Sequence, residues 1–156
     1  MCLTILKKTN KRVAKANILV YKCLDCEDDK YCTPFQSFPI YFNNGKTELE
    51  VENFTYSHHI DILHSCIVNT VNQGIHAYYV YNEAKDVCNA FGNCCGTKTH
   101  YAIIPKGAKY YVGSKGDVVS TKLIIFETEE DYKNYVENND EKICIINENS
   151  LSLQKI

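Results

Sequence analysis

The chain has 156 residues, of which 45% are hydrophobic and 23% are charged, and its formal net charge is −2. This composition is typical of a globular protein and excludes an intrinsically disordered chain, and the length suits one domain over residues 1–156. No apolar run approaches the roughly 18 residues of a membrane-spanning helix, so we expect no membrane partner.

The first half of the chain predicts strands separated by turns. Residues 12–24 contain a continuous apolar run and predict a central strand, which leads into an acidic loop over residues 25–33. Asn43-Asn44-Gly45 is a strong turn signal, and residues 46–56 alternate as a half-exposed strand does. From Ser57 onward, apolar residues recur at spacings of three and four, which predicts a helix that ends near residues 72–74. The apolar residues of that predicted helix are Ile60, Leu63, Ile67, Val68 and Val71.

The second half continues the mixed pattern. Residues 74–81 predict a strand, and Asn82 is a suitable N-cap for a helix that Gly92 would end. Thr128 opens a second short helix with acidic residues in its first turn. Further strands are predicted over residues 101–104, 108–112, 118–126 and 144–146, with a turn at residues 105–107. We therefore predict an α+β fold, a single domain with a mainly antiparallel twisted sheet and two or three short helices.

The charges are unevenly distributed along the chain. Residues 1–24 carry six basic residues and no acidic residue. We expect residues 1–12 to form a basic N-terminal arm, and RNA phosphates or an acidic protein to bind this region. The residues expected to make that contact are Lys7, Lys8, Lys11, Arg12 and Lys15. Arg12 is the only arginine in the chain, which argues against sequence-specific DNA recognition. At the other end, we expect residues 148–156 to be a frayed polar tail.

Tyrosine is frequent, with 12 residues against no tryptophan. Tyrosine favours strands, and it also suits binding surfaces because it combines contact area with a hydroxyl. Tyr78, Tyr79, Tyr110 and Tyr111 lie in predicted strands, and we expect them to form a partner-binding face.

The nine cysteines are an odd number, and the N-terminus turns basic after six residues, unlike a signal peptide. We therefore expect a cytoplasmic protein with reduced thiols and no structural disulfides. Cys23 and Cys26 form a C-x-x-C motif that could bind zinc together with Cys94 and Cys95. Adjacent cysteines are poor chelators of one ion, however, so we expect no metal and small, packed free thiols instead.

Among the five histidines, His76 is the strongest candidate for chemistry. It follows a glycine in a predicted strand and lies two residues before Tyr78. It could hydrogen-bond a ligand or act as an acid or base, with Asp117 or Glu83 nearby. The alternative is a structural histidine whose hydrogen bonds are satisfied within the fold.

Several of these segments resemble known proteins. The run Gly74-Ile75-His76-Ala77-Tyr78, followed by Ile104-Pro105-Lys106-Gly107, resembles small uncharacterised proteins of bacteriophages and mobile elements. The order of strand, helix and strand is also similar to the half-barrel of ADP-ribosyltransferases, which implies NAD as substrate and His76, Tyr78 and Asp117 as catalytic candidates. Tyr21-Lys22 stands where such enzymes usually carry Arg or His, and Asp117 stands where they usually carry Glu.

We therefore expect a phage-type accessory protein that acts in the cytoplasm of a bacterial host without a cofactor. It would bind a host protein or ribonucleoprotein complex and inhibit an antiviral system such as a CRISPR effector, rather than act as an enzyme. The alternatives are a divergent ADP-ribosyltransferase-like enzyme and a small zinc-binding domain.

Overall fold

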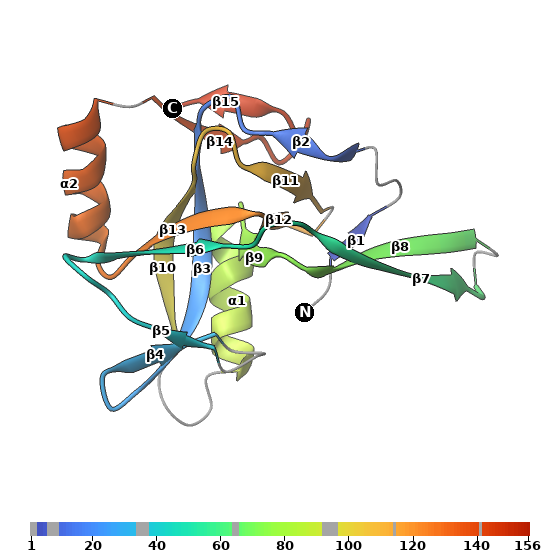
Figure 1. The fold of residues 1–156 in the computed structure, drawn as a ribbon, viewed down its shortest axis with the longest axis horizontal. Helices are drawn as coiled ribbons and strands as arrows, with labels where there is room; N and C mark the ends of the chain where they lie inside the picture. The colour runs from blue at the N-terminus through green and yellow to red at the C-terminus, as the bar shows by residue number, and fades with distance from the viewer. Residues whose placement is uncertain are drawn as a thin grey trace.

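A computed structural model of the chain describes residues 3–5, 10–33, 38–63, 66–91, 97–113, 115–140 and 142–156 (Figure 1). The strands of the first half are β1 (Leu3–Ile5), β2 (Arg12–Val13), β3 (Asn17–Glu27), β4 (Lys30–Cys32), β5 (Pro39–Ile40), β6 (Lys46–Glu50), β7 (Thr55–Asp61), β8 (Cys66–Gln73) and β9 (Ile75–Tyr78). Those of the second half are β10 (Thr97–Ile104), β11 (Lys109–Val112), β12 (Asp117–Ser120), β13 (Lys122–Phe126), β14 (Ile143–Ile146) and β15 (Leu153–Lys155). The described helices are α1 (Tyr81–Phe91) and α2 (Glu129–Asn139).

One large sheet organises the domain. Its strands follow the order β2-β11-β12-β9-β3-β10-β13-β6, and all of these pairs are antiparallel. β14 adds a short parallel pairing alongside β3, and β15 pairs with β14. The predicted α+β class with a mainly antiparallel sheet is therefore confirmed.

The long strand β3 lies at the centre of this sheet because its apolar residues can be buried on both faces. It pairs with β10 over eight residue positions, from Thr97 opposite Asp25 to Ile104 opposite Ile18. Ile18, Val20 and Leu24 are fully buried on one face, among the residues of the main core. Leu19 lies on the opposite face, in a second apolar cluster.

Both helices pack on that second face. Tyr132 and Tyr135 of α2 contact Phe126, with ring centroids 5.6 and 5.2 Å apart. Thr128 caps the helix as predicted, because its hydroxyl accepts from the Asp131 backbone N–H and the Asp131 carboxylate accepts from the Thr128 N–H. Helix α1 begins at Tyr81, one residue before the predicted N-cap.

Two predicted turns are confirmed by their backbone geometry. Asn44 and Gly45 have φ angles of 53° and 77°, as the two central residues of a tight hairpin turn require. Gly107 has φ 89° in the turn between β10 and β11, where the Ala108 N–H donates to the Pro105 carbonyl at 3.1 Å.

The helix predicted from Ser57 to Val71 is wrong, because this segment forms the antiparallel hairpin β7–β8. The spacing of the apolar residues fits a helix, but residues 66–73 are rich in β-branched residues, which favour strands. Residues 69–71 of β8 pair with β7 on one side and with β1 on the other, so their backbone groups are bonded on both sides. Cross-strand pairing therefore overrides the local period.

Both chain ends differ from the prediction. Within the predicted N-terminal arm, Leu3–Ile5 pair with β8 and Arg12 lies in β2, so these parts are integrated in sheets. Leu153–Lys155, predicted to fray, pair with β14. The Arg12 guanidinium donates to the Leu151 carbonyl and so ties the two ends of the chain together.

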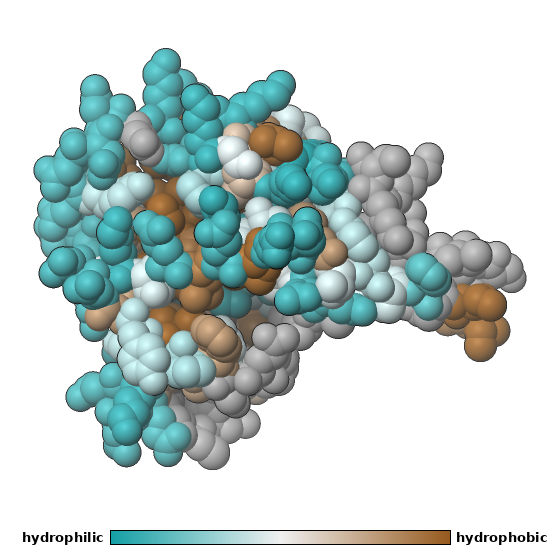
Figure 2. All heavy atoms as spheres, viewed as in Figure 1, coloured by the Kyte–Doolittle hydropathy of each residue, from teal (hydrophilic) through white to brown (hydrophobic). Residues whose placement is uncertain are grey.

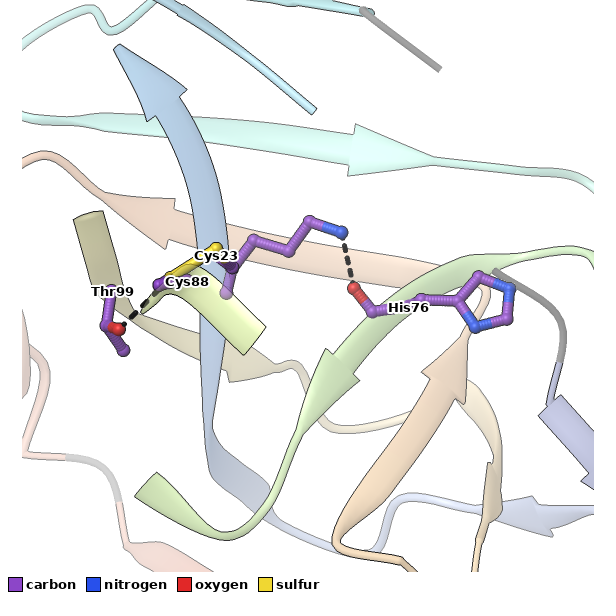
Figure 3. Close-up of a disulfide and its surroundings, with 5 residues drawn as sticks. Cys23, His76, Cys88 and Thr99 are labelled. Atoms are coloured by element: carbon purple, nitrogen blue, oxygen red, sulfur yellow. Dashed lines mark hydrogen bonds between the residues drawn. A yellow bond between two sulfur atoms is a disulfide. The ribbon is translucent and has the colours of Figure 1, made fainter. Parts of the chain in front are cut away.

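The expectation of no structural disulfide is also wrong. Cys23 of β3 and Cys88 of α1 are joined by a disulfide, with their Cα atoms 5.7 Å apart (Figure 3). Both cysteines are buried, and the Thr99 hydroxyl donates to the Cys88 sulfur at 3.3 Å. An odd number of cysteines leaves at least one thiol unpaired, but it does not prevent one pair from meeting across a helix–sheet contact. Cys26, Cys32 and Cys144 are free thiols.

Reducing the disulfide is expected to destabilise the protein. The bond links residues 65 positions apart, so the chain-entropy model gives about 4 kcal/mol of stabilisation through the unfolded state. Urea unfolding with and without dithiothreitol measures this loss, and the Cys88→Ala variant should show no dependence on the reductant. Equal midpoints for the wild-type protein in both conditions would contradict the prediction.

Candidate functional site

The hairpin β7–β8 projects from the body of the domain (Figure 1). Its far end carries exposed apolar side chains: Ile60 is 71% exposed, Ile62 87% and Leu63 92%. Figure 2 shows this apolar cluster at the end of the projection. We call Ile60, Ile62 and Leu63 the hairpin tip. Large apolar side chains that cluster in an exposed position commonly mark a site of interaction.

The base of the hairpin is fixed to the sheet by aromatic packing. Phe54, Val71, Tyr111 and Val119 form a buried cluster, and Tyr56 packs against it. The hydroxyls of Tyr56 and Tyr111 share a hydrogen bond of 2.8 Å. Burial and this hydrogen bond raise the pKa of Tyr111 well above its ordinary value. The tip is therefore presented from an anchored base.

A cavity of about 460 Å³ opens where strands β3 and β9 diverge. The two strands pair only at Tyr21 opposite Tyr78. Beyond this pair the two strands diverge, as their ribbons show in Figure 3. Lys22 lines the cavity together with apolar side chains of other elements, among them Leu49, Val51 and Val87.

Lys22 is buried, with 9% of its surface exposed. Its amine donates to the His76 carbonyl at 2.5 Å and so bridges the diverging strands. Across the described part of the chain, no carboxylate lies within ion-pair distance of this amine. Burial lowers the pKa of Lys22 to about 8. The amine can therefore change its charge near neutral pH, and it retains donors beyond the one that it uses.

The His76 ring points away from the disulfide and from the lysine amine, although its carbonyl accepts from that amine (Figure 3). Burial, followed by the charge of Lys22, lowers the pKa of His76 to about 4, so the ring is neutral at pH 7. Its Nε2 is buried and has no hydrogen-bond partner among the described residues. The predicted carboxylate Asp117 lies opposite Tyr78, whereas Val119 lies opposite His76. The three catalytic candidates are thus neighbours in the sheet, but Asp117 is not the cross-strand partner of the histidine.

The four tyrosines predicted to form a binding face are instead buried, with exposures of 1–8%. Tyr78 lines the cavity, and burial, followed by the charges of Asp117 and Glu83, raises its pKa to about 12. The Tyr79 hydroxyl donates to the Gly113 carbonyl at 3.1 Å. Tyr110 belongs to the main core, and Tyr111 anchors the hairpin. The expectation of an exposed tyrosine surface is therefore wrong.

The basic residues of the predicted arm are only partly placed. Lys7 and Lys8 lie outside the described residues. Lys11 and Lys15 are exposed on either side of β2, while the half-buried Arg12 binds the chain itself through Leu151.

The cysteines proposed as zinc ligands do not form a site in the part of the chain that the structure describes. Cys23 is bonded to Cys88, which removes it from the candidate set. Cys94 and Cys95 lie outside the described residues. The described residues contain no group of three or more His, Cys, Asp or Glu side chains arranged to hold a metal ion.

Sequence reasoning missed Lys22 as a site residue and the hairpin tip as a surface. A signal for Lys22 was present in the sequence. It lies two residues from Val20 and two from Leu24, and side chains at this spacing point to the same, buried face of a strand. No comparable signal marked the hairpin tip, because the helical period places Ile60 and Leu63 on the apolar side of the predicted helix.

Comparisons with known proteins found no match: no family model fits the chain, and no curated protein or solved structure is significantly similar. Of the helices that the structure describes, none has the length and apolar character needed to cross a membrane.

The buried amine should make stability depend on pH. The unfolded chain holds the Lys22 proton up to pH 10.5, whereas the folded chain releases it near pH 8. Stability should therefore rise with pH above 8, by about 1–2 kcal/mol up to pH 9.5 relative to the Lys22→Met variant. Urea unfolding of both proteins between pH 7 and 9.5 measures this difference. The exposed control Lys109→Met should keep the wild-type profile, and parallel profiles for wild type and Lys22→Met would contradict the assignment.

Proposed function

We propose that the protein is a binding protein whose hairpin tip inserts into an apolar pocket of a host protein. The exposure of Ile62 and Leu63 at the end of an anchored hairpin is the observation that carries this proposal. A narrow two-stranded projection suits a concave partner surface, and buried apolar anchors supply most of the binding energy at such interfaces. In line with the phage-type resemblance, the partner would be a component of an antiviral system in the bacterial cytoplasm, alone or within a ribonucleoprotein complex.

The composition of the hairpin favours a protein over a nucleic acid or a lipid surface. Residues 55–73 contain no lysine or arginine. Nucleic acids and anionic membranes are bound largely through such residues. The exposed Lys11 and Lys15 lie at the β2 edge of the sheet, and there they would add an electrostatic contact to an acidic partner or to RNA.

The NAD-using alternative has less support from the geometry. Such an enzyme needs an accessible acid–base set, but Tyr78 is buried and the His76 ring has no carboxylate opposite it. We therefore propose binding, without a cofactor, as the function.

Replacing Ile62 and Leu63 together with aspartate should abolish partner binding while the fold is retained. Burial of each side chain contributes about 1.5–3 kcal/mol, so affinity should fall at least about 100-fold. Both side chains are exposed, so the melting temperature should change little. Tagged protein first captures the partner from a bacterial lysate, and calorimetry on the purified partner then gives the affinity.

The control is Ile156→Asp, which changes an exposed isoleucine at the C-terminus, outside the hairpin. It should bind as the wild type does. Undiminished binding by the double aspartate variant would overturn the proposal. Flotation of the wild-type protein with phospholipid vesicles, lost in the double variant, would identify a lipid surface instead.

A further inference from the structure

The cavity between β3 and β9 contains a charge that the fold does not neutralise. The Lys22 amine is buried, and the His76 carbonyl is its one hydrogen-bond acceptor among the described residues. Removing an ammonium from water costs several kcal/mol unless it is paired. No described carboxylate pairs with it, so an anion that entered the cavity would gain a charge-assisted hydrogen bond.

The walls of the cavity restrict what kind of anion fits. Leu49, Val51, Ile75 and Val87 present apolar side chains. The polar residues Glu50, Asn72 and Gln73 also line the cavity but are exposed, and the Glu50 carboxylate pairs with Lys122. A multiply charged anion such as phosphate would lose its hydration shell against one ammonium and mainly apolar walls. A single negative charge attached to an apolar body matches both the lysine and the walls. The volume of about 460 Å³ lies in the range of small-molecule sites.

We propose that this cavity is a binding site for an apolar monocarboxylate, with the carboxylate on the Lys22 ammonium and the hydrocarbon body between the apolar walls. The site is separate from the hairpin tip and does not depend on the proposed partner. It involves no bond-making step, only ion pairing and apolar burial.

Among the described residues, the ionisable groups nearest the amine are His76, Tyr78, His100 and Glu50. His76 has its pKa lowered to about 4 and Tyr78 has its pKa raised to about 12. His100 lies directly opposite Lys22 on β10, and burial lowers its pKa. Glu50 is exposed and pairs with Lys122 at 3.2 Å, and Cys23 is held in the disulfide. Binding of a carboxylate should therefore weaken as the pH rises through about 8.

The test measures binding of octanoate, 1-octanol and inorganic phosphate by calorimetry at pH 7. Octanoate should bind at least tenfold more tightly than octanol, and phosphate should not compete with it. From pH 7 to pH 10 the affinity for octanoate should fall at least tenfold, while that for octanol stays constant. These comparisons use the wild-type protein and need no variant to fold.

Two variants then test whether the Lys22 ammonium is the group that binds the carboxylate. Lys22→Met keeps the length of the side chain and should lower octanoate affinity to the level of octanol, whereas Lys109→Met, at an exposed lysine of β11, should bind as the wild type does. Equal affinity for octanoate and octanol in the wild type would overturn the proposal. So would octanoate binding that survives Lys22→Met, or phosphate binding tighter than octanoate binding.

Discussion

Strand β3 is the constraint on which the rest of the structure depends. It pairs with β10 along most of its length, and with β4, β9 and β14 over shorter stretches. Because side chains alternate between the two faces, the burial of Val20 and Leu24 also commits Lys22 to the core side. Strand β9 pairs with β3 at a single residue pair, beyond which the two strands diverge. The lysine amine reaches across this gap to the His76 carbonyl, so a charged group stands where strand pairing ends.

The fold could be predicted where local chemistry determines the backbone. Asn44-Gly45 adopts the positive φ angles that its turn requires, and Thr128 with Asp131 forms the expected capping box. Residues 57–71 could not be assigned in this way, because their apolar spacing fits a helix and their β-branched content fits a strand. The strand conformation is fixed by pairing within the hairpin and by pairing with β1, which lies more than 60 positions away in the chain.

The candidate site was less predictable, for a different reason. Whether a tyrosine is exposed depends on what packs against its face of the sheet, which alternation within one strand cannot reveal. Tyr111 is buried because the base of a hairpin formed by residues 54–73 lies against it. Likewise, Cys23 and Cys88 are 65 positions apart, and only the packing of α1 on β3 brings them together.

Gly74 connects the two features to which we assign function. It lies between β8 and β9, so the hairpin ends beside this residue, and the residues on both sides of it, Asn72 to His76, line the cavity. A Cβ atom built there would lie 2.4 Å from Val119 Cγ2 and 3.0 Å from Phe54 Cδ1, closer than packing allows. Only glycine lets the chain pass this close to the aromatic cluster. The direction of the hairpin and the position of the cavity wall are therefore set by one close backbone approach, even though the tip and the lysine bind through different chemistry.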